Sequence, residues 1–370
     1  MPLIDFRRQW QEIREDATRV FEEVGASGWY ILGREVSSFE EKLAGSWGLG
    51  HATGVGNGLD AIEIALRALD IRPGERVLTT PLSAFATTLA IVRCDAVPVF
   101  VDTDRHGLLD LAACAEALDR DPFIRFVVPV HLYGHALDMP RLRALAERDG
   151  VKVVEDCAQA IGATWDGIPA GTVGAAAAVS FYPTKNLGAL GDGGAVLTRS
   201  ATVDARARRL RHYGQSATYV HDEVGLNSRL DELQAALLGR VLLPRLPVWT
   251  ERRRAVASRY VLELSNLAVE VPVPPRAEGS VWHLFPVLVA GERRAAFRRH
   301  LGERGVESGV HYPTLIPSQG ALQPLGHGAP ASAFPNASRF AEGEVSLPVH
   351  PFLSDDEVAR VVGAVNSWSG

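Results

Sequence analysis

Apolar residues along the chain follow two alternating patterns, one typical of amphipathic helices and one typical of buried strands. Residues 59–69 (LDAIEIALRAL) have helical spacing, and residues 125–132 (RFVVPVHL) form the near-continuous apolar run of a strand buried on both faces. From about residue 50 helix-like and strand-like segments alternate. This alternation predicts an α/β fold with a mostly parallel sheet flanked by helices.

The same patterns place the remaining elements. The predicted strands cover 77–80, 97–102, 125–132, 151–156, 176–182 and 195–198. The predicted helices cover 1–25, 59–69, 83–92, 138–149, 202–212, 229–243, 249–266 and 355–367. The prolines at 272, 274 and 275 punctuate a boundary, and residues 320–335 should be irregular. We expect a large domain over residues 1–248, with an N-terminal helix over 1–25, and a smaller C-terminal α/β domain over 249–370.

Composition and charge exclude several classes of protein. The chain has 370 residues, of which 46% are hydrophobic and 22% charged, as in ordinary globular proteins. A net charge of −6 gives no reason to expect nucleic-acid binding. Three cysteines form neither a disulfide framework nor a metal-site spacing. With no signal-like N-terminus and no convincing membrane span, the expectation is a cytoplasmic protein that binds neither membrane nor nucleic acid.

The sharpest chemical feature is SFYPTKNLGALGDGG, residues 180–194. Lys185 closely follows a predicted buried strand, and only three of the 38 basic residues are lysines. A desolvated lysine can lose its proton and form a Schiff base, which an arginine cannot do. The glycines that follow permit close approach of a bound group. The alternative is an ordinary exposed loop lysine.

Asp156 ends the predicted strand VKVVED, and Gln159 lies three residues beyond it. Ligands of open α/β sheets bind outside the carboxyl ends of the strands. A carboxylate there can pair with a protonated pyridine nitrogen, as pyridoxal phosphate requires. The alternative is that Asp156 only caps the next turn.

The segment GVGNGLDA, residues 54–61, places glycines just before a predicted helix, where backbone N–H groups can bind a phosphate. The same letters loosely fit a dinucleotide-binding fingerprint. An NAD(P)-dependent oxidoreductase of the Rossmann type is therefore the rival from another class, although its acidic residue would fall in a loop rather than at a strand end.

Metal sites find little support. His131 and His135 in HLYGH lie four residues apart, but Gly134 and the preceding strand argue against one helical face and therefore against zinc. The start of a calcium loop at Asp102 lacks the required glutamate at Ala113. Arg252–Arg254 has the pattern of a solvated helix face. We expect no metal.

Taken together, the motifs resemble the DegT-type family of pyridoxal-phosphate enzymes, the sugar aminotransferases. The resemblance covers almost the whole chain and rests on these segments in order: SGWYILGREVSSFE (27–40), GVGNGLDA (54–61), PVFVDTD (98–104), PVHLYGHALDM (129–139), VEDCAQAIGA (154–163), SFYPTKNLGALGDGGAV (180–196), GLNSRLDELQAALL (225–238) and GVHYP (309–313). It implies an aspartate-aminotransferase-like fold, fold type I of these enzymes, with pyridoxal 5′-phosphate as the cofactor.

The resemblance also implies roles for single residues. Lys185 matches the catalytic Schiff-base lysine, Asp156 the partner of the pyridine nitrogen, and Gln159 a residue near the 3-hydroxyl group. The other matching cofactor positions are Phe85 against the ring, Gly58, Leu59 and Ser180 at the phosphate, and Asn227 reaching the phosphate of a neighbouring subunit. The substrate side would include Tyr30, His311 and Tyr312, with Arg211 and Arg229 as diphosphate contacts.

The activity implied is transfer of an amino group, with L-glutamate as donor, to a nucleotide-linked keto-deoxysugar in a homodimer with shared active sites. The motifs most resemble those of family members that aminate C3 of a dTDP-3-keto-6-deoxyhexose. Amination at C4 and amination of a cyclitol ketone are the alternatives. Leu59 departs from the threonine of many members, so that backbone amides must serve the phosphate there. Sugar 3-dehydratases of the family have histidine where this chain has Lys185, which favours transamination. A non-catalytic regulatory descendant is a further alternative.

Overall fold

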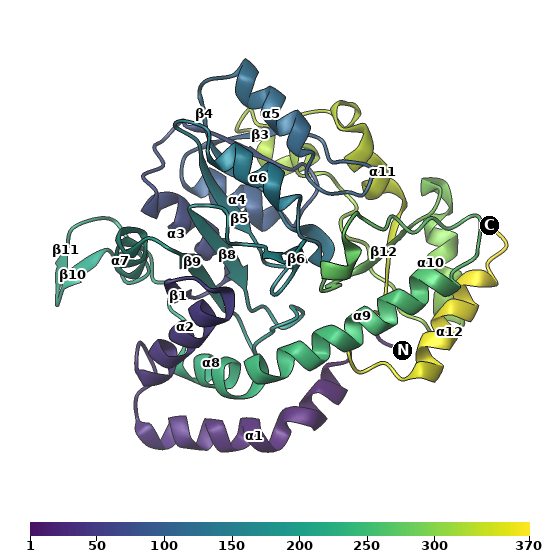
Figure 1. Cartoon of the computed structure of the whole chain (residues 1–370), viewed down its shortest axis with the longest axis horizontal. Coiled ribbons are helices and arrows are strands. Elements are labelled where there is room, and N and C mark those ends of the chain that lie inside the picture. Colours follow the sequence, from purple (N-terminus) through teal and green to yellow (C-terminus); the bar gives the residue numbers. More distant parts are fainter.

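The computed structural model describes residues 1–370 and centres on a seven-stranded sheet of order β1-β9-β8-β5-β4-β2-β3 (Figure 1). Neighbouring strands from β8 to β3 are parallel, and only β9 runs against its neighbours. The mostly parallel α/β sheet predicted from the sequence is confirmed. The strands are β1 (His51–Val55), β2 (Arg76–Thr79), β3 (Val97–Phe100), β4 (Ile124–Val128), β5 (Lys152–Asp156), β8 (Ala176–Ser180) and β9 (Gly194–Thr198).

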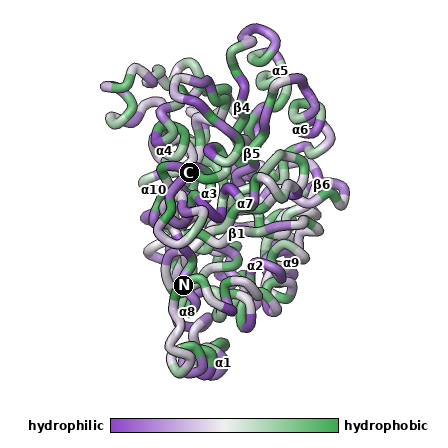
Figure 2. The backbone as a smooth tube through the Cα atoms, turned by 90° about the vertical axis from the view of Figure 1, so that its left-hand side faces the viewer, coloured by the Kyte–Doolittle hydropathy of each residue, from purple (hydrophilic) through white to green (hydrophobic).

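Helices cover both faces of this sheet. Because successive side chains of a strand point to opposite faces, Ala176 and Ala178 of β8 join the core with α3 and α7, whereas Ala177 and Val179 join that with α1, α2 and α8. Figure 2 shows hydrophobic and hydrophilic residues mixed along α1, as expected of an amphipathic helix. The helices are α1 (Phe6–Ser27), α2 (Arg34–Trp47), α3 (Gly58–Ala68), α4 (Phe85–Arg93), α5 (Leu111–Arg120), α6 (Met139–Ala146), α7 (Ala201–Leu210) and α8 (Glu232–Leu237).

The C-terminal part has a core of its own around the antiparallel pair β12 and β13. Its elements are α9 (Leu246–Glu263), β12 (Phe285–Leu288), α10 (Arg294–Glu303), α11 (Pro335–Gly343), β13 (Glu344–Leu347) and α12 (Asp355–Asn366). Helix α9 runs without a break across the boundary expected after residue 248. The exact division into domains therefore stays a prediction. None of the helices combines the length and apolar composition that crossing a bilayer requires.

Two small hairpins complete the chain. One pairs β6 (Thr164–Trp165) with β7 (Ile168–Pro169), and the other pairs β10 (Gln215–Ala217) with β11 (Val220–His221). The β10–β11 hairpin projects from the body of the molecule at the left of Figure 1. Tyr219 at its tip is 90% exposed.

Some elements differ from the sequence-based expectation. The predicted strand 125–132 ends at Val128, and the residues after it form a turn in which Tyr133 has a φ of 60°. The predicted helix 229–243 begins only at Glu232 and passes into a π-helical turn at Leu238–Leu242. Residues 320–335 contain only short 3₁₀ turns before α11, as expected, although Leu322 and Phe334 are buried.

Candidate active site

Asp156 and Lys185 are brought to the same edge of the sheet by neighbouring parallel strands. Asp156 is the last residue of β5, and its register partner is Ala178 of β8, the strand that leads to Lys185. The carboxyl ends of parallel strands are where α/β sheets bind ligands. The structure therefore places the two residues at the position that the sequence predicted for them.

Lys185 lies in a largely desolvated environment. Burial lowers the pKa of its amine to about 8, and the negative charge of Asp156 opposes that shift. Its Nζ makes no hydrogen bond and no ion pair within the protein, and the residue is half-buried. An exposed loop lysine would keep its proton and its hydration. The arrangement instead leaves an amine that can lose its proton near neutral pH and react with a carbonyl.

Asp156 is 4% exposed and is held by two donors. Its Oδ2 accepts a 2.8 Å hydrogen bond from the hydroxyl of Thr87, and its Oδ1 accepts a 3.0 Å bond from the N–H of Ala158. Burial raises the pKa of this carboxyl group, which the two bonds and the charge of Lys185 oppose. Asp156 thus caps the next turn and still presents a buried carboxylate that a cationic ligand would stabilise.

Gln159 joins the end of β5 to the C-terminal part of the chain. Its Oε1 accepts a 2.7 Å hydrogen bond from the N–H of Tyr133, and its Nε2 donates a 3.1 Å bond to the hydroxyl of Tyr312. The hydroxyl of Tyr133 in turn donates to the carbonyl of His311 at 2.6 Å. The structure thus brings the predicted substrate-side residues His311 and Tyr312 to the predicted cofactor residue Gln159.

The start of α3 has the form of a phosphate cradle. The N–H groups of Gly58 and Leu59 lie in the first turn of α3, where no preceding turn can accept their hydrogen bonds. A Cβ on Gly58 would stand 2.6 Å from the Cβ of Ser180, so that only glycine allows the helix and the end of β8 to approach so closely. The positive end of the helix dipole and the adjacent Ser180 hydroxyl fit a phosphate group.

Three further predicted residues lie around these groups. Phe85 is the first residue of α4, two positions before Thr87, and is partly exposed. Asn227 is exposed and forms an isolated antiparallel β-bridge with His212, so the two residues flank the projecting hairpin in the sequence. Tyr30 is half exposed, and its hydroxyl donates to the carbonyl of Gly25. Their expected contacts with cofactor, substrate or partner subunit stay predictions.

The two predicted diphosphate contacts differ in accessibility. Arg211 is only 6% exposed, and its Nη1 binds the carboxylate of Glu40 and the carbonyl of Gly54. This burial argues against the expected role, because a charge already paired in the interior is not free to bind a diphosphate. Arg229 is more open, with Nη1 3.1 Å from Nδ1 of His212 and its guanidinium over the ring of Tyr213.

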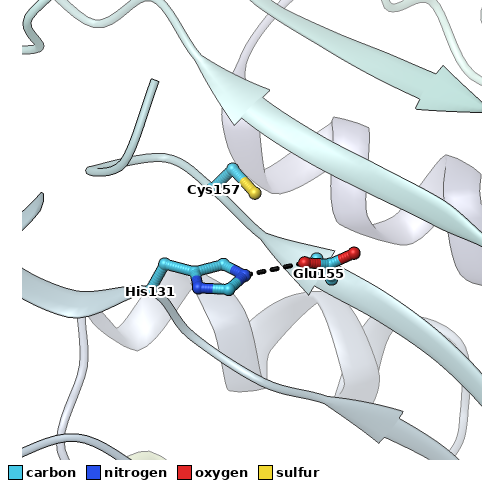
Figure 3. A group of neighbouring side chains, drawn as sticks. All are labelled: His131, Glu155 and Cys157. Atoms are coloured by element: carbon cyan, nitrogen blue, oxygen red, sulfur yellow. Dashed lines mark hydrogen bonds and ion pairs between the residues drawn. The ribbon is translucent and has the colours of Figure 1, made fainter. Parts of the chain in front are cut away.

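His131, Glu155 and Cys157 form a buried group (Figure 3), and the last two flank Asp156 in the sequence. Nε2 of His131 is 2.9 Å from Oε2 of Glu155, and its Nδ1 accepts the N–H of Leu137. Glu155 also accepts three backbone N–H groups from residues 171–174. Because these bonds occupy both ring nitrogens of His131 and both carboxylate oxygens of Glu155, the pair is an internal anchor for the loop that enters β8.

Several residues of the site carry no recognisable signal in the sequence. Thr87 and Tyr133 reach the site through bonds to residues far along the chain. Glu344 of β13 is fully buried and accepts the N–H of His311 at 2.6 Å. Nothing in the local sequence marks a glutamate in an apolar strand as a partner of a loop some 30 residues earlier.

Comparison with known proteins gives consistent matches along the chain. The model of the DegT/DnrJ/EryC1/StrS aminotransferase family matches residues 11–366. A dTDP-3-amino-3,4,6-trideoxy-α-D-glucose transaminase of Streptomyces venezuelae is 40% identical over 371 aligned residues, covering 100% of this chain and 96% of that protein. These matches contradict the alternative of an NAD(P)-dependent oxidoreductase.

Solved structures agree with the sequence matches. The crystal structure of S. venezuelae DesV in complex with a ketimine intermediate has a TM-score of 0.94 and 40% identity, covering 99% of this chain and 98% of that one. NtdA of Bacillus subtilis, solved with bound cofactor PMP, has a TM-score of 0.88 and 30% identity, covering 98% and 82%. The predicted aminotransferase fold is confirmed.

Proposed function

The chain belongs to the DegT/DnrJ/EryC1/StrS aminotransferase family, and from this premise we propose that it transfers an amino group to a keto group of a nucleotide-linked deoxysugar. The observation that carries the proposal is the pair formed by Asp156 at the end of β5 and Lys185 in the loop that follows β8. An intact lysine favours a catalyst over a non-catalytic regulator. Similarity to a dTDP-3-amino-3,4,6-trideoxy-α-D-glucose transaminase favours C3 of a dTDP-3-keto-6-deoxyhexose, with C4 or a cyclitol ketone as the alternatives.

Pyridoxal 5′-phosphate is the cofactor of this family, and the residues present fit it. When bound, it supplies an aldehyde that condenses with amines and a protonated ring that withdraws electrons from the reacting carbon. Asp156 would hold the ring nitrogen, and Gln159 would approach the 3-hydroxyl group. The remaining cofactor residues would be Phe85 at the ring, and Gly58, Leu59 and Ser180 at the phosphate.

Lys185 has two tasks in this chemistry. Its Nζ would hold the cofactor covalently until the amino donor replaced it, and the freed amine would then act as a general base. In the first half-reaction Nζ takes the proton from the α-carbon of the donor. In the second half-reaction it delivers a proton to the sugar carbon that receives the amine. A pKa lowered to about 8 suits both directions of transfer near neutral pH.

Asp156 keeps a negative charge where the ring nitrogen must stay protonated. Thr87 and the N–H of Ala158 fix both carboxylate oxygens, so that the charge need not be reorganised during the reaction. A cationic nitrogen beside it would lower the pKa of Asp156 and offset the cost of its burial.

We also propose a homodimer with shared active sites and L-glutamate as the donor. The exposed apolar residues Tyr219, Val220 and Val224 lie on or beside the projecting β10–β11 hairpin, and Asn227 follows them. A second copy that covers this arm would bury their apolar surface and receive Asn227 at its own phosphate site. Tyr30, Arg229, His311 and Tyr312 would then line the space for the sugar nucleotide.

The test uses purified holoenzyme with L-glutamate and a dTDP-3-keto-6-deoxyhexose. We expect formation of 2-oxoglutarate together with a dTDP-amino sugar that mass spectrometry identifies. The 4-keto isomer and a cyclitol ketone are run in parallel, and the preferred acceptor is the one with the highest kcat/KM. The proposal is wrong if the protein binds pyridoxal phosphate but aminates none of these ketones.

A further inference from the structure

A buried hydrogen-bonded chain connects β13 to the loop that carries His311. Glu344 and Ser346 both point from β13 into the interior and are fully buried. The hydroxyl of Ser346 donates to Oε1 of Glu344, and the hydroxyl oxygen of Ser346 lies 2.9 Å from Nδ1 of His311. Oε2 of Glu344 accepts the N–H of His311 at 2.6 Å. One carboxyl group thus binds both the backbone of His311 and, through Ser346, its ring.

The other ring nitrogen of His311 is the one available to a ligand. Nε2 makes no hydrogen bond within the chain, whereas the carbonyl of His311 is fixed by Tyr133. The positive charge of Lys185 acts on the His311 ring, and the adjacent Tyr312 bonds Gln159. His311 therefore stands at the active site with one nitrogen anchored and the other free.

Two contacts make up this hydrogen-bonded chain, one between Oε1 of Glu344 and the Ser346 hydroxyl and one between that hydroxyl and Nδ1 of His311. With a neutral ring and the Ser346 hydroxyl as a donor, only two proton arrangements place one hydrogen in each contact. With Glu344 ionised, the Ser346 hydroxyl must donate to it, so Ser346 accepts from Nδ1–H and Nε2 of a neutral ring is bare. With Glu344 protonated on Oε1, its O–H donates to Ser346, the hydroxyl of Ser346 donates to Nδ1, and Nε2 carries the proton. Going from the second form to the first, the group loses one proton to solvent, and the ring proton is on Nδ1 instead of Nε2.

We propose that Glu344, acting through Ser346, is a positioning residue that sets the tautomer of His311 and so decides whether Nε2 meets the substrate as a hydrogen-bond donor or acceptor. The inference rests on the proposed function only for the identity of that substrate. A donor at Nε2 suits a keto, carboxylate or phosphate oxygen of the ligand, and an acceptor suits a sugar hydroxyl group.

The charges around this hydrogen-bonded chain of Glu344, Ser346 and His311 allow both forms near neutral pH. Burial raises the pKa of Glu344 to about 8, opposed by Ser346, the His311 N–H and the arginines Arg294 and Arg298 of α10. Burial, with the charge of Lys185, lowers the pKa of His311 to about 4, so the ring stays neutral. The titratable hydroxyl groups of Tyr133 and Tyr312 face the same region from the other side and stay protonated, because burial raises their pKa values.

Nitrogen NMR of histidine-labelled holoenzyme tests this proposal, because the ring nitrogens report the tautomer directly. The His311 signals are assigned by their loss in His311→Gln. In the wild type we expect the proton to leave Nε2 for Nδ1 as the pH rises through about 8. In Glu344→Gln the amide oxygen can accept the His311 N–H while its NH₂ donates to Ser346. That variant should therefore keep Nε2 protonated at every pH.

Two further variants make the outcome decisive. Ser346→Ala removes the hydroxyl that links Glu344 to the His311 ring, leaves Glu344 in place, and should remove the pH dependence of the tautomer. Glu342→Gln makes the same change of charge at an exposed neighbour and should behave as the wild type. A wild-type tautomer that does not change with pH, or one that still titrates in Glu344→Gln or in Ser346→Ala, overturns the proposal. These spectra need no turnover, so failure of the amination assay is a separate result.

Discussion

The hydroxyl of Thr87 donates a 2.8 Å hydrogen bond to Oδ2 of Asp156 across 69 residues of sequence. The bond joins the first turn of α4 to the end of β5, so that the helix that begins at Phe85 and the buried carboxylate move as one unit. Phe85, expected to stack on the cofactor ring, and Asp156, expected at the ring nitrogen, are thereby linked through α4.

Replacing Thr87 by valine should weaken cofactor binding while leaving the fold intact. The variant keeps the shape of the side chain but leaves Oδ2 of the buried Asp156 with one donor fewer. Loss of a bond to a buried charged group costs about 1–3 kcal/mol, or roughly ten- to a hundredfold in affinity. Titration of the apoprotein with pyridoxal phosphate measures the effect. Thr87→Ser retains the hydroxyl group and should bind nearly as the wild type does; equal losses in both variants would contradict the role of the bond.

Removal of the Lys185 amine should abolish covalent attachment of the cofactor. Lys185→Ala and Lys185→Arg should both lose the visible absorbance of the attached cofactor, since arginine keeps the charge but does not condense with the aldehyde. Turnover should fall by at least about a hundredfold, the usual contribution of a general base. Lys42→Ala, which removes a lysine that bonds only the carbonyl of Gly239, is the matched control. Near-normal turnover in Lys185→Ala would refute the assigned role.

The attachment of pyridoxal phosphate to the apoprotein should depend on pH through Lys185. The reactive form is the free amine, and burial lowers the pKa of Lys185 to about 8 from its ordinary 10.5. The attachment rate should therefore rise with pH and level off above about 8, rather than continue to rise towards 10.5. Stopped-flow absorbance against pH gives the midpoint. A midpoint near the ordinary value would mean that the amine is solvated.

Gly58 should tolerate no side chain. A Cβ there would lie 2.6 Å from the Cβ of Ser180, and neither α3 nor the end of β8 can move without disturbing the phosphate cradle. Overpacking of this kind costs about 1–3 kcal/mol of folding free energy. Gly58→Ala should lower both the melting temperature and the affinity for pyridoxal phosphate. Gly25→Ala, in α1 with nothing within 4 Å of the added carbon, should leave the cofactor affinity unchanged and should not lower the melting temperature, because alanine favours the helix. Unchanged cofactor affinity in Gly58→Ala would argue against the cradle.

The apolar pattern was enough to predict the sheet and the position of Lys185 and Asp156, because Asp156 ends one buried strand and Lys185 closely follows another. The ends of elements were less predictable. Strand β4 stops at Val128 because Pro129 and the turn at Tyr133 divert a chain that is still apolar. The apolar run therefore predicted burial correctly and the strand end incorrectly.

Partners of buried charges could not be predicted, because they are distant in sequence. Arg253 lies in an arginine-rich stretch that resembles a solvated face, yet it is buried and donates to the carbonyls of Trp282 and Val349. Arg211 is likewise buried and pairs with Glu40. Local sequence shows that a residue is charged, but only the packing of whole elements decides which charges leave the surface.

The Glu344 carboxyl group should make stability depend on pH in a defined direction. Burial raises its pKa to about 8 in the folded protein, against an ordinary value of 4.5 that the unfolded chain should keep. Between these values the folded state binds the proton and the unfolded state does not, so the free energy of unfolding falls as pH rises, by up to about 1.4 kcal/mol per pH unit. Below 4.5 and above about 8 both states have the same protonation, and the dependence disappears.

Glu344→Gln has no such proton, so its stability relative to the wild type should increase through this window and then stay constant. Denaturant unfolding of both proteins at a series of pH values measures the difference, with Glu342→Gln as the control that should show no trend. A difference between wild type and Glu344→Gln that does not change with pH would mean that Glu344 titrates as an ordinary carboxyl group.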